Sequence, residues 1–297
     1  MYRFSWGVGS PAMSSLASEF HLLQQERLRS LVFPREHGAW GILLVPLVTG
    51  AWIGFETGRG ILPLLLFLVA CLALFCLRTP AEIWLEPSPL RAQRPAERQA
   101  VLYSIFAYAA LATVAVAYLL GHDRAYGLLI LGAVVGALFI AQALLKKLGR
   151  PTRMTAQLIG SLGLTSTAAG AYYVVTGRLD SQAWVLWGAN WLFAANQIQF
   201  VQLRIHSARA AGLAEKFARG RIFLAAQFLT LILLVAAWRA GGLPGAAALA
   251  FAPALIRGFL WFLRRPAPLE IYRLGYGELA NALAFGALFI LGFQLQL

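Results

Sequence analysis

Residues 61–77 read ILPLLLFLVACLALFCL, an unbroken apolar run that ends at Arg78. About 17 to 25 apolar residues in a helix suffice to cross the hydrocarbon core of a bilayer. Soluble folds bury their apolar residues in shorter, periodic segments, so this run predicts a membrane-spanning element. The run lacks the alternation of a membrane β-barrel, and backbone amides in lipid must be satisfied within their own segment. The element is therefore expected to be a helix.

Eight other apolar runs share this texture. Together the predicted spans are 38–55, 61–77, 100–120, 125–145, 154–176, 182–203, 220–238, 243–263 and 276–296. Of the 297 residues, 60% are hydrophobic and only 12% are charged, whereas soluble domains are about 25% charged. We therefore expect an all-α fold, a polytopic membrane bundle of about nine transmembrane helices.

The basic residues lie almost entirely on one side of this bundle. Of the 25 Lys and Arg, 21 precede the first span or lie in or near the connections after even-numbered spans, and four lie on the other side. An excess of Lys and Arg marks cytoplasmic loops. We expect a multi-pass protein of the bacterial inner membrane, with a cytoplasmic N-terminus and a periplasmic or extracellular C-terminus. The net charge of +13 is spread between apolar spans rather than over one folded face, which argues against a nucleic-acid partner.

The chain before the first span has a different character. Residues 1–30 lack the continuous apolar core of a cleaved signal peptide. We expect a cytoplasmic N-terminal tail over 1–30, partly disordered, with a possible amphipathic surface helix over Leu16–Val32. Residues 31–297 are expected to form a single transmembrane domain.

A dense motif, Phe33-Pro-Arg-Glu-His-Gly-Ala-Trp-Gly41, stands at the cytoplasmic entrance to the first span. In one interpretation Arg35, Glu36 and His37 form a polar cluster at the mouth of a cavity, where Arg35 and Glu36 bind substrate. In the other, the Arg and Trp side chains are an interfacial anchor of the kind common in membrane proteins. The sequence leaves both open.

This FPREHGAWG-type opening, followed by a hydrophobic all-helical chain, resembles the YwiC-like family of uncharacterised bacterial membrane proteins. The resemblance is expected to cover residues 31–297. It implies a membrane location and a helical fold, but it supplies no activity to transfer.

A more distant resemblance does imply an activity. The helix count, the cytoplasmic N-terminus and the charged connections after spans two and six are similar to those of the UbiA superfamily of intramembrane prenyltransferases. That resemblance implies one acidic motif in each of these connections, which together hold Mg²⁺ on a prenyl diphosphate. Divalent metal held by carboxylate oxygens neutralises the charge of the departing diphosphate.

The first of these connections matches the superfamily in part. Glu82 and Glu86 are spaced like the last two acids of the superfamily motif and would ligate Mg²⁺, while Arg91 and Arg94 echo its following basic segment and would clamp phosphate. The motif's first two polar positions are Arg and Thr here, and Glu replaces Asp twice. The alternative is a solvated loop with two incidental glutamates.

The second connection has no acidic motif. Asn196, Gln199 and His206 lie near one helical face, which indicates a polar cavity beneath the loop or, alternatively, hydrogen bonds between helices. Arg204 would bind an anion directly, and His37 or His206 would orient or deprotonate an acceptor.

Glu278 lies near the start of the ninth span. An acidic residue inside a membrane span is by default a candidate functional residue, so Glu278 is predicted to contact substrate.

Three functions follow from these residues. The leading hypothesis is a UbiA-like prenyltransferase that transfers the prenyl group of an isoprenoid diphosphate to an aromatic or lipid acceptor. The second is a non-catalytic membrane carrier or lipid-binding protein of unknown ligand, which metal-independent binding or flux of an anionic lipid would distinguish from the first. The third is a redox partner or assembly factor with His37 and His206 as haem ligands.

Overall fold

The computed structural model describes residues 24–34, 37–55, 60–85, 92, 94–207, 212–264 and 270–295, without the side chains of His37, Arg150 and Ile271. Every regular element in these ranges is a helix, so the predicted all-α fold is confirmed. Residues 24–32 are helical, in agreement with the second half of the amphipathic helix expected over Leu16–Val32. The first half of that helix lies outside the described residues.

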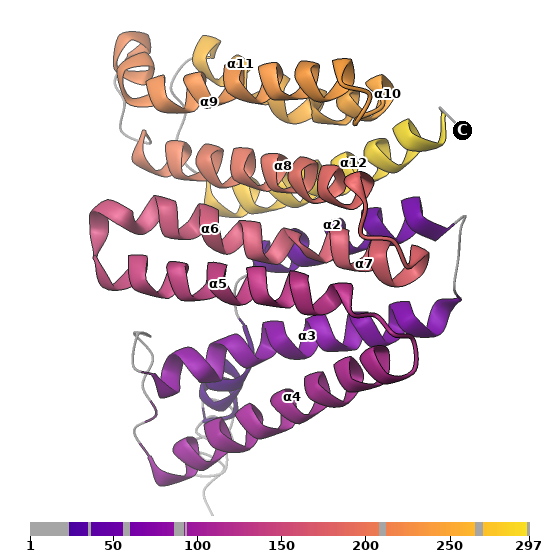
Figure 1. The fold of residues 1–297 in the computed structure, drawn as a ribbon. Helices are drawn as coiled ribbons and strands as arrows, with labels where there is room; N and C mark the ends of the chain where they lie inside the picture. Colours follow the sequence, from indigo (N-terminus) through magenta and orange to yellow (C-terminus); the bar gives the residue numbers. More distant parts are fainter. Residues whose placement is uncertain are drawn as a thin grey trace, which may run out of the picture. The chain divides into compact units, whose positions relative to one another are not determined.

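The remaining helices follow the predicted spans. They are α2 (His37–Gly54), α3 (Ile61–Trp84), α4 (Pro95–Gly121), α5 (Gly127–Lys147), α6 (Arg153–Thr165), α7 (Thr167–Thr176), α8 (Ser181–His206), α9 (Leu213–Arg239), α10 (Gly245–Ala248), α11 (Ala252–Leu263) and α12 (Ile271–Gln294), with 3₁₀ turns η2 (Arg150–Thr152) and η3 (Leu249–Phe251). Each predicted span falls on one helix or on a consecutive pair, as for α6 with α7 and α10 with α11 (Figure 1).

Within the described ranges, seven helical stretches are long and apolar enough to cross a membrane, and α2 and α8 are not among them. Helix α2 is apolar but has only 18 residues. Helix α8 has 26 residues but carries several amide side chains. The multi-pass membrane character is therefore confirmed, whereas the count of nine crossings is not. The orientation and the choice of the inner membrane stay predictions.

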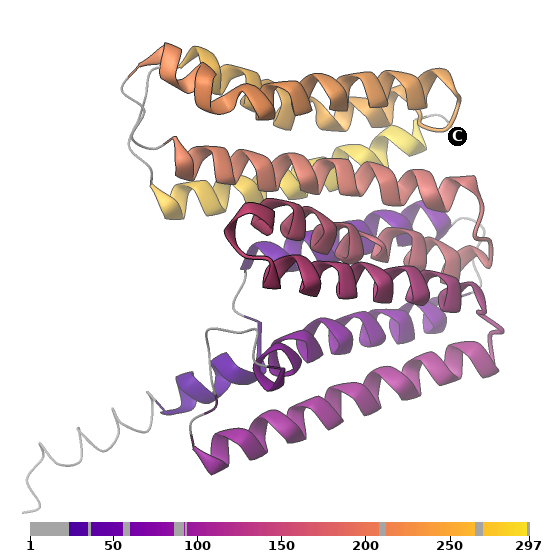
Figure 2. The same cartoon turned by 60° about the vertical axis from the view of Figure 1, so that its left-hand side comes forward.

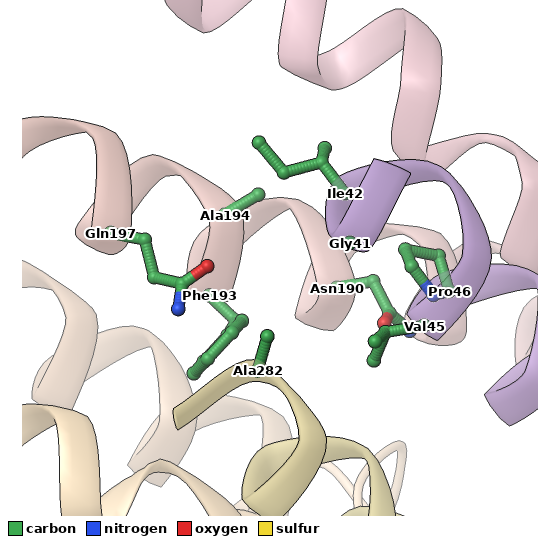
Figure 3. A pocket seen from close by; sticks show the side chains of 9 residues that line it. All are labelled: Gly41, Ile42, Val45, Pro46, Asn190, Phe193, Ala194, Gln197 and Ala282. Atoms are coloured by element: carbon green, nitrogen blue, oxygen red, sulfur yellow. The ribbon is translucent and has the colours of Figure 1, made fainter. Parts of the chain in front are cut away.

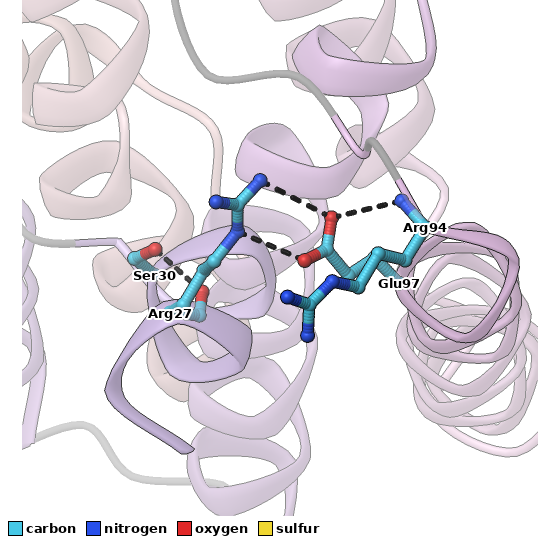
Figure 4. A network of polar contacts seen from close by, with 4 residues as sticks. All are labelled: Arg27, Ser30, Arg94 and Glu97. Atoms are coloured by element: carbon cyan, nitrogen blue, oxygen red, sulfur yellow. Dashed lines mark hydrogen bonds and ion pairs between the residues drawn. The ribbon is translucent and has the colours of Figure 1, made fainter. Parts of the chain in front are cut away.

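The chain divides into two compact units, and the first contains the described part of residues 1–35 together with Leu72–Thr113. Its apolar centre is Leu31, Ile83 and Val101. The buried Glu97 carboxylate accepts a hydrogen bond from the Arg94 backbone N–H at 3.3 Å and pairs with Arg27 Nε at 2.8 Å (Figure 4). A glutamate in the first turn that accepts from a backbone N–H ahead of it stabilises the helix start. Glu97 thus both begins α4 and holds the helix at 24–32 against it.

The second unit contains Glu36–Cys71 and Val114–Leu297. Helix α8 contacts α6, α7, α9 and α2 in this unit, so it lies among the other helices, as the two views of Figures 1 and 2 agree. Its Phe193 ring stacks on Phe285 of α12 with centroids 3.9 Å apart, and Phe251 meets Phe285 edge-on. These rings belong to the largest buried apolar cluster of the unit.

Helices α2 and α7 approach each other closely because small residues face each other. A Cβ atom at Gly50 would lie 2.7 Å from the carbonyl carbon of Ala168 and closer still to its oxygen. The Thr167 hydroxyl donates to the Leu43 carbonyl of α2 at 2.9 Å, next to the break between α6 and α7. Small residues that bring backbones together are the usual basis of helix association in lipid.

Candidate functional site

Helix α8 is the polar helix of the second unit, and its amides reach different neighbours. Asn190 Nδ2 donates to Thr49 Oγ1 of α2 at 3.1 Å. Gln202 Nε2 donates to Gln157 Oε1 of α6 at 3.1 Å. In a membrane such bonds join helices, since the alternative is an unsatisfied polar group in an apolar medium. They explain how a helix with this composition is accommodated inside the bundle.

Asn196 contributes to the same kind of contact. Its Nδ2 donates to Gln227 Oε1 of α9, and both side chains are buried. Gln227 can lie there because Gly258 of α11 has no side chain, and a Cβ at that position would collide with the Gln227 amide. For Asn196 the structure therefore supports the alternative of an interhelical hydrogen bond. Its Oδ1 is buried and has no hydrogen-bond partner among the described residues.

We expect Gln227→Met to lower the free energy of unfolding by about 1–3 kcal/mol, because it leaves the buried Asn196 amide without its hydrogen-bond acceptor. The double variant Asn196→Leu/Gln227→Met should cost less than the sum of the two single variants, since both partners are then apolar. Detergent-induced unfolding of the purified protein measures both. Gln199→Leu is the control, because Gln199 is half-buried and makes no hydrogen bond within the described chain. Strict additivity of the two single changes would contradict the pairing.

A small pocket lies between α2, α8 and α12 (Figure 3). Its lining includes Gly41, Val45 and Pro46 of α2, Asn190 and Gln197 of α8, and Ala282 of α12. Its volume is about 10 Å³, roughly what one ordered water requires. This pocket does not hold a prenyl chain, and the cytoplasm-facing cavity expected from the sequence stays a prediction.

The most unusual contact of the second unit is an ion pair between Arg257 of α11 and Glu278 of α12. Arg257 Nη1 donates to Glu278 Oε1, and the two side chains are 21% and 14% exposed. The Arg257 guanidinium also lies 4.1 Å from the centre of the Phe200 ring of α8. Arg257 Nε and Nη2 and Glu278 Oε2 are buried and find no partner among the described residues. Among the described residues, the buried polar atoms of this pair therefore meet only part of their hydrogen-bonding capacity.

Two further cations are linked to this pair, Arg204 directly and Lys216 through Arg204. Arg204 of α8 is half-buried, makes no hydrogen bond or ion pair within the described part of the chain, and acts electrostatically on both Glu278 and Lys216. Lys216 of α9 is only 2% exposed; its Nζ donates to the carbonyls of Trp261 and Arg264, and it lies 4.1 Å from the Trp261 ring centre. We call Arg204, Lys216, Arg257 and Glu278 the four-charge cluster.

The structure brings only some of the predicted residues to this cluster. Arg204 and Glu278 belong to it, and their predicted roles in substrate binding stay predictions. His206 is exposed, with Nδ1 2.7 Å from the Gln202 carbonyl oxygen. Gln199 is half-buried on α8. The acid–base role of His206 and its role as a haem ligand remain predictions.

The other predicted residues lie in the first unit or outside the description. Arg94 contributes its backbone N–H to Glu97. Glu82 Oε1 accepts from Arg78 Nε at 3.0 Å. Five candidates fall where the structure gives no side chain: Arg35, Glu36, His37, Glu86 and Arg91. Their roles stay predictions.

A Mg²⁺ site requires several oxygen donors gathered at one place. In the described ranges, His, Cys, Asp and Glu side chains form no group of three or more that could hold a metal ion. The Glu82 carboxylate is engaged by Arg78, so a metal there competes with a guanidinium. The described donors do not by themselves make a magnesium site, and the Mg²⁺ site stays a prediction.

A comparison with known families bears on the N-terminal half of the chain. Residues 33–173 match the YwiC-like protein family. The predicted resemblance is thus confirmed from Phe33, the first residue of the motif, to Tyr173 in α7. No curated protein and no solved structure matches the chain, and the resemblance to prenyltransferases stays a prediction. The four-charge cluster lies beyond the YwiC-like match.

The sequence reasoning missed Arg257 and Lys216. Arg257 interrupts the predicted span 243–263, and a charged residue inside a span is a candidate functional residue by the same rule that selected Glu278. The sequence therefore does contain a signal for Arg257. For Lys216 the sequence carries no comparable signal, because it precedes the predicted span 220–238 among other loop charges.

Proposed function

We propose that this protein is a non-catalytic lipid-binding protein of the membrane, whose four-charge cluster holds the phosphate headgroup of an anionic lipid. The observation that carries the proposal is the pair of buried Arg257 nitrogens, Nε and Nη2, that have no acceptor among the described residues. A buried donor without an acceptor costs about 1–3 kcal/mol. A phosphate oxygen would satisfy these donors, since guanidinium geometry suits bidentate recognition of phosphate.

The charge around Arg257 also favours an anion. Arg204 acts on Glu278 and also on Lys216, and Glu278 is the single acid among the four charges. Lys216 Nζ donates to two backbone carbonyls and lies over the Trp261 ring, so the lysine contributes mainly positive potential. Arg204 has its donors available. An arginine-held phosphate requires no metal ion.

The surroundings favour a lipid over a free anion. Apolar side chains in the turns of α9, α11 and α12 nearest the cluster are exposed, namely Leu213, Phe217, Leu260, Leu263, Tyr272 and Tyr276. Exposed apolar surface at the end of a membrane span contacts lipid chains or the interface. A ligand with a phosphate headgroup and an apolar tail matches both the charge and this surface.

The proposal is tested by isothermal titration of short-chain phosphatidylglycerol into the purified chain in neutral detergent. We expect saturable binding that Arg257→Gln weakens about tenfold or more, because a charge-assisted hydrogen bond contributes about 1.5–3 kcal/mol. Arg221→Gln is the matched control. It removes one exposed cation of α9, in the half of the helix that also contains Lys216. It should change the Kd less than about twofold.

Three further ligands separate the alternatives. Glycerophosphate tests the headgroup alone and should bind more weakly than the lipid; equal binding would indicate a free-phosphate site. Short-chain phosphatidylcholine, which has no net charge, should not compete. Release of diphosphate from geranylgeranyl diphosphate with Mg²⁺ would instead favour the prenyltransferase. An equal effect of Arg221→Gln and Arg257→Gln would contradict the assigned site.

A further inference from the structure

Glu278 lies beside the Arg257 donors where an anionic ligand would bind. Its Oε1 accepts from Arg257 Nη1, while its Oε2 is buried without a partner within the described chain. The backbone at this point is held, because the Gln197 side chain of α8 donates to the Glu278 carbonyl at 2.8 Å. The side chain can therefore change its partner without a movement of α12.

The charges that face Glu278 come from two neighbouring helices. Arg257 approaches from α11 and Arg204 from α8. Lys216 of α9 adds its charge through its proximity to Arg204. Helix α2 also packs on α12, but its residues 38–54 contain no titratable side chain, and neither do α10 and η3. A proton gained or lost by Glu278 is thus felt mainly by the two arginines.

A phosphate bound to Arg257 would lie beside the Glu278 carboxylate. Two anions that share one buried site cannot both keep their charge easily, and the carboxylate is the group that gains a proton. The proton adds to a carboxylate oxygen and forms an O–H group, while Arg257 Nε and Nη2 donate to the phosphate. On release of the phosphate, the proton leaves and the ion pair forms again.

We infer that Glu278 is an internal counter-ion of Arg257 and that binding of the anionic headgroup is coupled to uptake of a proton by Glu278. This inference rests on the proposed lipid-binding function. It makes the site sensitive to pH, with tighter binding as the pH falls. A carrier built this way would move a proton together with its anion.

The test is titration calorimetry of the full chain with short-chain phosphatidylglycerol in buffers of different protonation enthalpy, between about pH 5 and about pH 8. The phosphodiester keeps one charge over this range, so any proton that is taken up enters the protein. We expect uptake approaching one proton per lipid, and a Kd that rises by up to about tenfold per pH unit where Glu278 titrates. Glu278→Gln should bind with no proton uptake and a flat pH profile.

Two control variants locate the proton. His206→Gln should keep the uptake, because His206 is an exposed group outside the cluster. Glu270→Gln should keep it as well, since Glu270 pairs with Arg273 at the surface. Binding of the wild-type chain without proton uptake overturns the inference and leaves the proposed function standing. Absence of saturable binding overturns both. The wild-type proton count decides the matter even where a Glu278 variant fails to fold.

Discussion

Gly50→Ala is expected to destabilise the packing of α2 on α7. The new methyl group would lie 2.7 Å from the carbonyl carbon of Ala168, and the nearest atoms all belong to the backbone of α7. Overpacking of a well-packed site costs about 1–3 kcal/mol, and a clash with backbone falls at the upper end, since no side chain can rotate away. We expect the free energy of unfolding in mixed micelles to fall by about 3 kcal/mol.

Gly136→Ala is the matched control. Gly136 lies in the apolar helix α5, and a Cβ there would meet no atom within 4 Å. Replacement of a helical glycine by alanine with free space gains up to about 1 kcal/mol. The same chemical change should therefore lower the free energy of unfolding at Gly50 and raise it at Gly136. An equal response at both would mean that α2 and α7 do not approach as closely as the structure shows.

Much of the fold could be predicted from the sequence because lipid imposes a local rule. An apolar run of sufficient length must be a helix, and this rule placed α3, α5 and α9 without any knowledge of their neighbours. It says less about α8, whose amides are tolerated only because Thr49, Gln157 and Gln227 lie opposite them. Whether α8 counts as a span therefore depends on tertiary contacts.

The candidate site could be predicted only in part for a related reason. Glu278 was found because an acid inside an apolar span is unusual in itself. Its partner Arg257 lies 21 residues earlier on another helix, and no periodic rule joins positions on two helices. The spacing also left the role of Glu82 ambiguous. Residues four apart in a helix share a face, so Glu82 could act together with Glu86 or pair with Arg78. In the structure Glu82 pairs with Arg78.

Glu278→Leu is expected to be more damaging than the loss of any surface charge. It would leave Arg257 charged and largely buried, with no acid beside it. Removal of one partner of a buried ion pair costs about 3–5 kcal/mol. Replacement of both partners by apolar residues is often nearly neutral, so Arg257→Leu/Glu278→Leu should recover most of the loss. Unfolding of the four proteins of this double-mutant cycle in mixed micelles measures the coupling.

The exposed pair of the same helix supplies the comparison. Glu270 and Arg273 are 59% and 84% exposed in their side chains, with 2.9 Å between Oε2 and Nε. Pairs this exposed contribute well under about 1 kcal/mol, because water and salt screen them. Glu270→Leu should therefore leave the unfolding midpoint almost unchanged. If Glu278→Leu were equally harmless, Arg257 would find an acceptor elsewhere, and its two free nitrogens would no longer indicate an anion site. A large coupling energy with recovery in the double variant would instead show that the bundle tolerates Arg257 only in the presence of a negative charge, whether from Glu278 or from a ligand.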